Sequence, residues 1–169
     1  MTVIEFRAPW SKGLRITTVS RITFLALLVT LVIFARLPPV AIVIVIGFAV
    51  LLVAREVAGR VRGYTLTEDS ITVHRGLWET RLPLAGLRSV TGDVDAIRGA
   101  IRMGMHGGMF SYTGTFWNKK LGWYRTFVTD PSRAVVLRYP KRTIVISAHD
   151  TQQFIMRAGT FIKVAGFPK

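Results

Sequence analysis

The residues best suited to hydrolytic chemistry lie near the end of the chain, where Ser147, His149 and Asp150 almost adjoin one another. A serine nucleophile, a histidine base and an orienting carboxylate must converge from different structural elements. These three residues instead sit where a predicted strand ends and a predicted helix begins, and Ser and Asp side chains commonly cap helices at such positions. We therefore predict no catalytic residues here.

The sequence also contains no convincing motif for binding a metal ion or a phosphate group. His74, His106 and His149 are too widely separated to form a zinc-binding His-x-x-x-His pair. Asp93 and Asp95 could bind a cation or share a proton, although a solvated turn is the simpler interpretation. The glycines nearby are not followed by the Gly-Lys-Ser/Thr of a phosphate-binding loop; they are Gly99, Gly104, Gly107 and Gly108. The chain has no cysteine, which excludes thiolate catalysis and cysteine-ligated zinc. We expect no enzyme, no metal and no cofactor.

Two apolar runs in the first third of the chain, residues 22–35 and 40–54, predict a transmembrane hairpin. Crossing a bilayer takes about 20 helical residues. The first run reaches that length when extended to residues 17–37, and the second when continued through Ala58, before Gly59. Buried helices of a soluble protein, or a cleaved signal peptide, are the alternatives. The signal peptide is disfavoured because the second run would remain.

The net charge of +14 points to an anionic partner. The sequence contains neither a basic helix with interleaved aromatic residues nor an Arg/Gly-rich tail, the features that would indicate nucleic-acid binding. We therefore expect the anionic partner to be the lipid bilayer. Cations flank the hairpin, whereas Arg36 alone lies between its two runs; the flanking cations are Arg7, Lys12, Arg15, Arg21, Arg55, Arg60 and Arg62. By the positive-inside rule, both termini should be cytoplasmic, in a multi-pass protein of the inner membrane.

Beyond the hairpin the hydrophobic period changes to two, which predicts antiparallel strands. The expected strands are residues 64–67, 70–75, 77–82, 88–91, 109–117, 123–129, 134–139 and 143–147, with a long loop or an irregular hairpin over residues 92–108. A final amphipathic helix over residues 151–164 should be capped by Asp150. We expect an α+β membrane protein with an N-terminal segment (1–15), a transmembrane hairpin (16–59) and a cytoplasmic domain (62–169).

Several segments resemble the bacterial pleckstrin-homology-like (PH-like) domains, in the subgroup with two N-terminal transmembrane helices. They are residues 4–8 with Trp10, 64–73, 82–84, 107–117, 122–130 and 145–150 ahead of Phe154. One departure is Ala148, where the family tends to have proline. The resemblance implies a seven-stranded barrel or sandwich capped by the C-terminal helix, with a binding or assembly role. It does not imply phosphoinositide recognition, since the turn after residue 66 carries Glu68 and Asp69, which would repel phosphate.

Methionine and aromatic side chains adapt well to partner surfaces. The candidate partner or oligomer interface is Met103, Met105, Met109, Phe110, Tyr112, Trp117 and Trp123. The candidate contacts to anionic lipid, expected to be non-specific, are Arg15, Arg21, Arg55, Arg60, Arg62, Lys119, Lys120, Arg138, Lys141 and Arg142. We therefore expect a non-enzymatic assembly module that forms a homo-oligomer or scaffolds a membrane-protein partner. The alternative is a reader of anionic lipid headgroups or of a peptide.

Overall fold

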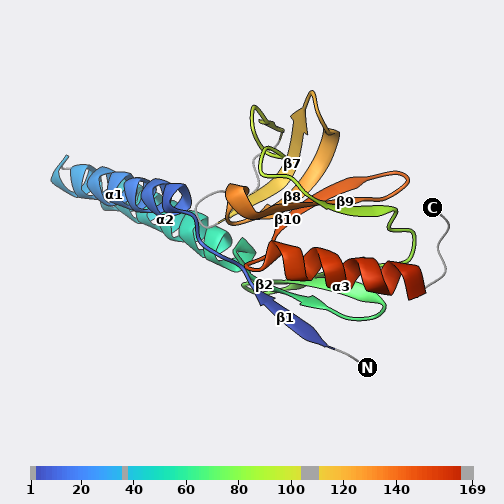
Figure 1. Cartoon of the computed structure of the whole chain (residues 1–169). Coiled ribbons are helices and arrows are strands. Elements are labelled where there is room, and N and C mark those ends of the chain that lie inside the picture. The colour runs from blue at the N-terminus through green and yellow to red at the C-terminus, as the bar shows by residue number, and fades with distance from the viewer. Residues whose placement is uncertain (1–2, 36–37, 104–110, 165–169) are drawn as a thin grey trace.

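A computed structural model describes residues 3–35, 38–103 and 111–164 of the chain. Two long helices project together from one end of a domain built of strands and a final helix (Figure 1). The elements are β1 (Ile4–Arg7), α1 (Lys12–Phe34), α2 (Pro39–Gly59), β2 (Val61–Leu66), β3 (Ser70–Arg75), β4 (Glu79–Pro83), β5 (Ser89–Gly92), β6 (Ile101–Met103), β7 (Tyr112–Asn118), β8 (Gly122–Val128), the 3-10 turn η1 (Pro131–Arg133), β9 (Ala134–Arg138), β10 (Thr143–Ser147) and α3 (Thr151–Val164).

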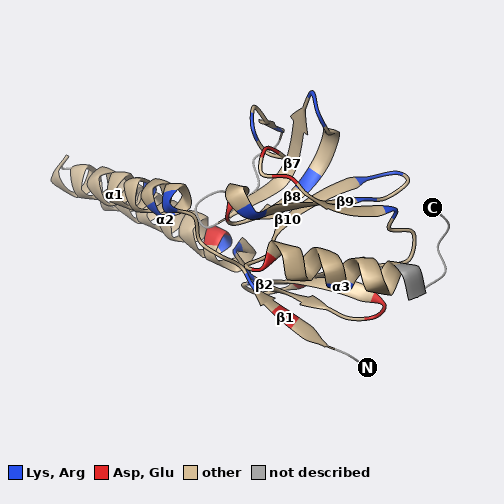
Figure 2. Ribbon diagram, viewed as in Figure 1, with Lys and Arg blue, Asp and Glu red and all other residues tan. Residues whose placement is uncertain are grey.

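Both projecting helices are long and apolar enough to span a membrane, with mean hydropathies of 2.1 and 2.6. Only 6% of the most apolar 18-residue stretch of each helix is buried inside the structure, whereas the core helices of a soluble protein are mostly buried. Ser11 caps α1 by accepting the Leu14 N–H at 3.1 Å, and Pro39 occupies the first turn of α2, where a missing N–H is tolerated. The charged residues described in the hairpin lie at its domain end (Figure 2).

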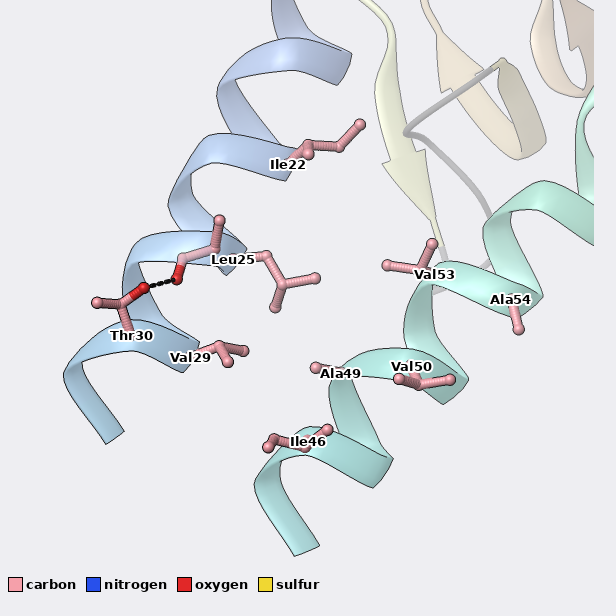
Figure 3. Close-up of a pocket in the computed structure, with 10 residues that line it drawn as sticks. Ile22, Leu25, Val29, Thr30, Ile46, Ala49, Val50, Val53 and Ala54 are labelled. Carbon is pink, nitrogen blue, oxygen red and sulfur yellow. Dashed lines mark hydrogen bonds between the residues drawn. The ribbon is translucent and has the colours of Figure 1, made fainter. Parts of the chain in front are cut away.

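An apolar space of about 680 Å³ lies between the two helices (Figure 3). Leu25 and Val29 of α1 point into it toward α2, and the lining residues described there carry no charge. The hydroxyl of Thr30 donates to the Ala26 carbonyl at 2.9 Å, so its polar group is satisfied within α1. This surface suits lipid chains or other apolar side chains.

The hairpin is inserted between two paired strands. β1 precedes α1 and β2 follows α2, yet the two strands pair antiparallel, with Ile4 opposite Leu66 and Arg7 opposite Gly63. They belong to sheet A, whose strand order is β1-β2-β3-β4. Both domain ends of the hairpin are therefore held by one sheet.

The second sheet, sheet B, has the strand order β5-β9-β10-β8-β7-β6. Its pairs are antiparallel except for β10 and β8, which run parallel. β6 (Ile101–Met103) lies inside the segment that we expected to be a long loop or an irregular hairpin, and it pairs with β7. This three-residue strand is too short to show a period of its own, and pairing with β7 organises it.

The main hydrophobic core lies between the two sheets and α3. Phe154 and Ala158 of α3 are completely buried in it, and the Phe154 ring meets that of Phe6 edge-on at 5.1 Å. α3 also packs on β5, where Gly92 leaves room for Ile155. The helix thus fills the side between the outer strands β1 and β5.

The predicted strands and C-terminal helix form a sandwich, one of the two expected architectures, and the sheets are not closed into a barrel. In the described part of the chain no strand pairs with the outer edge of β4, so the sheets stay separate there. A second core cluster on the other face of sheet B contains Phe116, Tyr124 and Val145. Sheet B is therefore a central layer, of which one end extends past sheet A.

Candidate binding surface beside the membrane helices

The turn between β3 and β4 is attached to the end of α2. The Leu77 N–H donates to the Ala58 carbonyl at 3.1 Å, and the Arg75 Nε donates to the Gly59 carbonyl at 3.2 Å. These bonds satisfy carbonyl groups that a helix end leaves without partners. A Cβ atom at Gly76 would overlap the carbonyl oxygens of Val57 and Ala58, so only glycine allows this approach.

The tip of the same turn is apolar and exposed. Leu77 is 80% exposed, and Trp78 next to it is about half exposed. The turn reaches the start of the charged region of the chain, because Leu77 bonds Ala58, which lies two residues beyond Glu56. Arg55 and Glu56 are the first charged positions after the apolar span of α2. Tryptophan is favoured at the headgroup level of a bilayer, which is where this turn would lie in a membrane-inserted hairpin.

A second contact region joins β6 to the hairpin. Burial lowers the pKa of Arg102, whereas the nearby carboxylate of Glu56 acts to raise it and Arg21 acts to lower it. Arg102 therefore lies near a charged residue of each of the two long helices, Arg21 of α1 and Glu56 of α2. Its Nη2 also donates to the Thr113 carbonyl of β7 at 3.3 Å.

Between these two attachments lies a cavity of about 480 Å³, which we call the arginine cleft. It is lined by Arg75, Trp78, Met103, residues 113–115 and Arg125. The guanidinium groups of Arg75 and Arg125 lie 5.5 and 5.1 Å from the centroid of the Phe127 ring. Burial lowers the pKa of Arg75, and the positive charge of Arg125 lowers it further. Two like charges therefore face one cavity.

One end of sheet B presents an uncovered face beside this cleft. Ile101 lies opposite Trp117, and Trp117 opposite Trp123, so these side chains share one face of the sheet. Met103 lies on the same face, two residues from Ile101. Phe127, on this face of β8, is completely buried, whereas Trp123 is 59% and Ile101 57% exposed. We call Ile101, Met103, Trp117 and Trp123 the open face.

A second cavity of about 430 Å³ connects the open face to the edge of β4. Its lining shares Thr115 and Arg125 with the arginine cleft and adds Arg81, Lys141 and Arg142. The Arg142 guanidinium lies 4.8 Å from the Tyr139 ring centroid. The two cavities form a continuous basic surface along the side of the sandwich that α3 does not fill.

The candidate interface from the sequence is only partly brought together. Met103 and Trp123 are exposed on the open face, and Trp117 is half-buried there. Tyr112 instead packs against the second core cluster. The remaining candidates, Met105, Met109 and Phe110, lie outside the described residues.

The candidate lipid-binding cations are dispersed. Arg15, Arg21 and Arg55 are exposed near the domain end of the hairpin, with Arg60 and Arg62 following α2. The remaining candidates lie at three places: Lys141 and Arg142 line the second cavity, Lys120 pairs with Asp93 at 2.6 Å, and Lys119 and Arg138 are exposed elsewhere on sheet B. The arginine pair of the cleft was not predicted, because no sequence spacing relates Arg75 to Arg125.

Three of the residues considered for catalysis or metal binding, Ser147, Asp150 and His74, have structural partners, whereas His106 lies outside the described residues. Ser147 Oγ accepts the Thr129 N–H at 2.9 Å, and Asp150 Oδ1 accepts the Gln153 N–H at 2.9 Å, which confirms the predicted capping by Asp150. His74 Nδ1 lies 2.7 Å from Glu79. In the described ranges no three His, Asp or Glu side chains gather as a metal site would require.

A family model described as bacterial PH domain matches residues 62–159. No curated protein and no solved structure gives a significant match to the chain. The matched region runs from β2 into α3 and so includes both sheets except β1.

Proposed function

Because the chain belongs to the bacterial PH domain family, whose members are generally non-catalytic, we propose that it is a membrane-anchored binding module that recognises a protein partner through the open face. The partner is a second copy of the chain or another membrane protein. In this proposal the hairpin crosses the cytoplasmic membrane, with the PH domain on the cytoplasmic side.

The anchoring is supported by the character of the two helices. Their apolar side chains face outward over lengths sufficient to cross a bilayer. Cations on both sides of the hairpin at its domain end fit the positive-inside rule. The contacts of Arg75 and Leu77 with the end of α2 would hold the PH domain at a fixed height above the lipid.

The observation that carries the proposal is the exposure of Trp123 and Ile101 on a regular, uncovered sheet surface. Tryptophan and methionine are enriched at protein interfaces, where a large rigid ring gains much contact area at a low entropy cost. On its other face, the same sheet buries the second core cluster, which includes Phe116 and Tyr124. The open face is thus an apolar surface that needs a partner to cover it.

The experiment compares complexes of the full-length protein in lipid nanodiscs by native mass spectrometry. A double substitution, Met103→Ala with Trp123→Ala, should abolish a discrete complex and leave the folded monomer. Met156→Ala is the control, since Met156 is also exposed, at 66%, but lies on α3. Complexes that survive the double substitution would contradict the proposal, as would equal losses in the double variant and the control.

A further inference from the structure

The arginine cleft lies at the membrane end of the domain. One wall contains Arg75 and Trp78, in the turn that is hydrogen-bonded to the last residues of α2. The other contains Met103, next to Arg102, whose charge is coupled to Glu56 of α2. When the hairpin spans a bilayer, both walls therefore stand at the level of the lipid headgroups.

The cleft is positively charged without a compensating carboxylate. All nine acidic residues of the chain are described, and none lines either cavity. Most are engaged elsewhere: Glu79 contacts His74, Asp93 contacts Lys120, Asp95 contacts Arg98, Asp130 contacts Arg133, and Asp150 caps α3. The cleft therefore lacks an internal counter-ion.

The two arginines are held in different ways. Arg75 is fixed, because its Nε bonds the Gly59 carbonyl and its guanidinium lies 4.8 Å from the Trp78 ring centroid. Arg125 is exposed on β8, and its side chain is oriented by the Phe127 ring. Guanidinium groups bind phosphate oxygens in pairs of parallel hydrogen bonds, and an anion between two of them also removes their mutual repulsion.

We propose that the arginine cleft binds the phosphate of an anionic phospholipid headgroup from the adjoining leaflet. In this proposal, the guanidinium groups of Arg75 and Arg125 neutralise the charge of the phosphate. Thr115, on the cleft wall, adds a hydroxyl donor, and the Trp78 ring lies beside the rest of the headgroup. This site is at the opposite end of β3 from the acidic Glu68–Asp69 turn, about 20 Å away. The site goes beyond the proposed protein-binding function and does not depend on it.

The test uses full-length protein in mixed micelles that contain equal amounts of phosphatidylglycerol and phosphatidylcholine. Native mass spectrometry measures the affinity for each bound lipid. The wild type should retain phosphatidylglycerol preferentially. Arg125→Gln should weaken that binding by at least about tenfold, because one charge-assisted contact is lost. Binding of phosphatidylcholine should not change.

Two further variants serve as controls. Arg157→Gln removes one exposed arginine from α3, outside the cleft, and should retain phosphatidylglycerol as the wild type does. Arg125→Lys keeps the charge without the planar fork and should give intermediate binding. Near-equal affinities of the Arg125→Gln and Arg157→Gln proteins would show that charge alone attracts the lipid, and would overturn the proposal.

Parallel titrations with inorganic phosphate and with poly-glutamate identify other anions. Phosphate binding that depends on Arg125, without preferential retention of phosphatidylglycerol, would make the ligand a soluble anion and overturn the lipid assignment. Poly-glutamate binding with the same dependence, again without lipid retention, would assign the cleft to an acidic peptide and overturn it too.

Discussion

Tyr64 shows how single side chains hold this fold together. It is completely buried where the two sheets meet, and its hydroxyl donates to the Phe127 carbonyl of β8 while accepting the Ser147 N–H at 3.2 Å. One side chain thus joins sheet A to two central strands of sheet B. The guanidinium groups of both cleft arginines lie near the Phe127 ring. By bonding the Phe127 carbonyl, Tyr64 therefore helps to position the candidate site.

Tyr64 should make stability fall at high pH. Burial raises the pKa of Tyr64 to about 12, against 10.0 for an ordinary tyrosine. The folded state holds the proton more tightly, so the stabilisation is complete below pH 10 and is lost as the pH rises through 12. Two pKa units correspond to about 3 kcal/mol in the free energy of unfolding. Denaturant unfolding of the full-length protein in detergent, followed across this range, measures the loss.

Tyr64→Phe provides the comparison, because the other ionisable groups are unchanged. At pH 8 the variant should be less stable by about 1–3 kcal/mol, since the buried partners of the hydroxyl lose a hydrogen bond. The difference between variant and wild type should shrink between pH 10 and 12. A constant difference would contradict the role assigned to the Tyr64 proton.

At the scale of elements, the β3–β4 turn connects sheet A to the hairpin of two long apolar helices. Gly76 lets the turn approach the last carbonyl groups of α2, and Leu77 and Arg75 bond them. The sequence indicated a tight turn at Gly76 but not what the turn touches, because Ala58 and Leu77 belong to different predicted segments. Sequence spacing predicts elements well and their docking poorly.

Gly76→Ala should loosen this attachment. The added methyl group would overlap the carbonyl oxygens of Val57 and Ala58, and such overpacking typically costs about 1–3 kcal/mol. Amide hydrogen exchange of the Leu77 N–H, which bonds Ala58, should accelerate by about tenfold or more. Gly159→Ala is the control, since a Cβ there meets open space in α3, and it should leave the exchange of Leu77 unchanged.

Over the whole molecule, the hairpin and the PH domain form one unit. β1 and β2 pair on either side of the hairpin, and the β3–β4 turn holds the end of α2. α3 fills one side of the sandwich, whereas the opposite side, between β4 and β8, leaves the open face and both basic cavities accessible. The arrangement fixes the open face and both cavities relative to the two candidate membrane-spanning helices.

Prediction from the sequence succeeded for those elements whose structure depends mainly on the residues of a single segment. Residues 22–35 and 40–54 predicted the helices by hydropathy, and Asp150 marked the start of α3. Closure of the barrel could not be predicted, because it depends on whether β4 finds a partner far away in the chain. Trp123 was a candidate from its residue type, but its exposure follows from how far sheet B extends past sheet A.

The most direct test of the central claim is photo-crosslinking from position 123 in intact membranes. A photoreactive amino acid that replaces Trp123 should join the chain to one discrete protein, either a second copy or a single membrane partner. The same amino acid in place of Met156, on α3, should give no such adduct. Adducts at both positions, or at neither, would contradict the claim that the open face binds a protein partner.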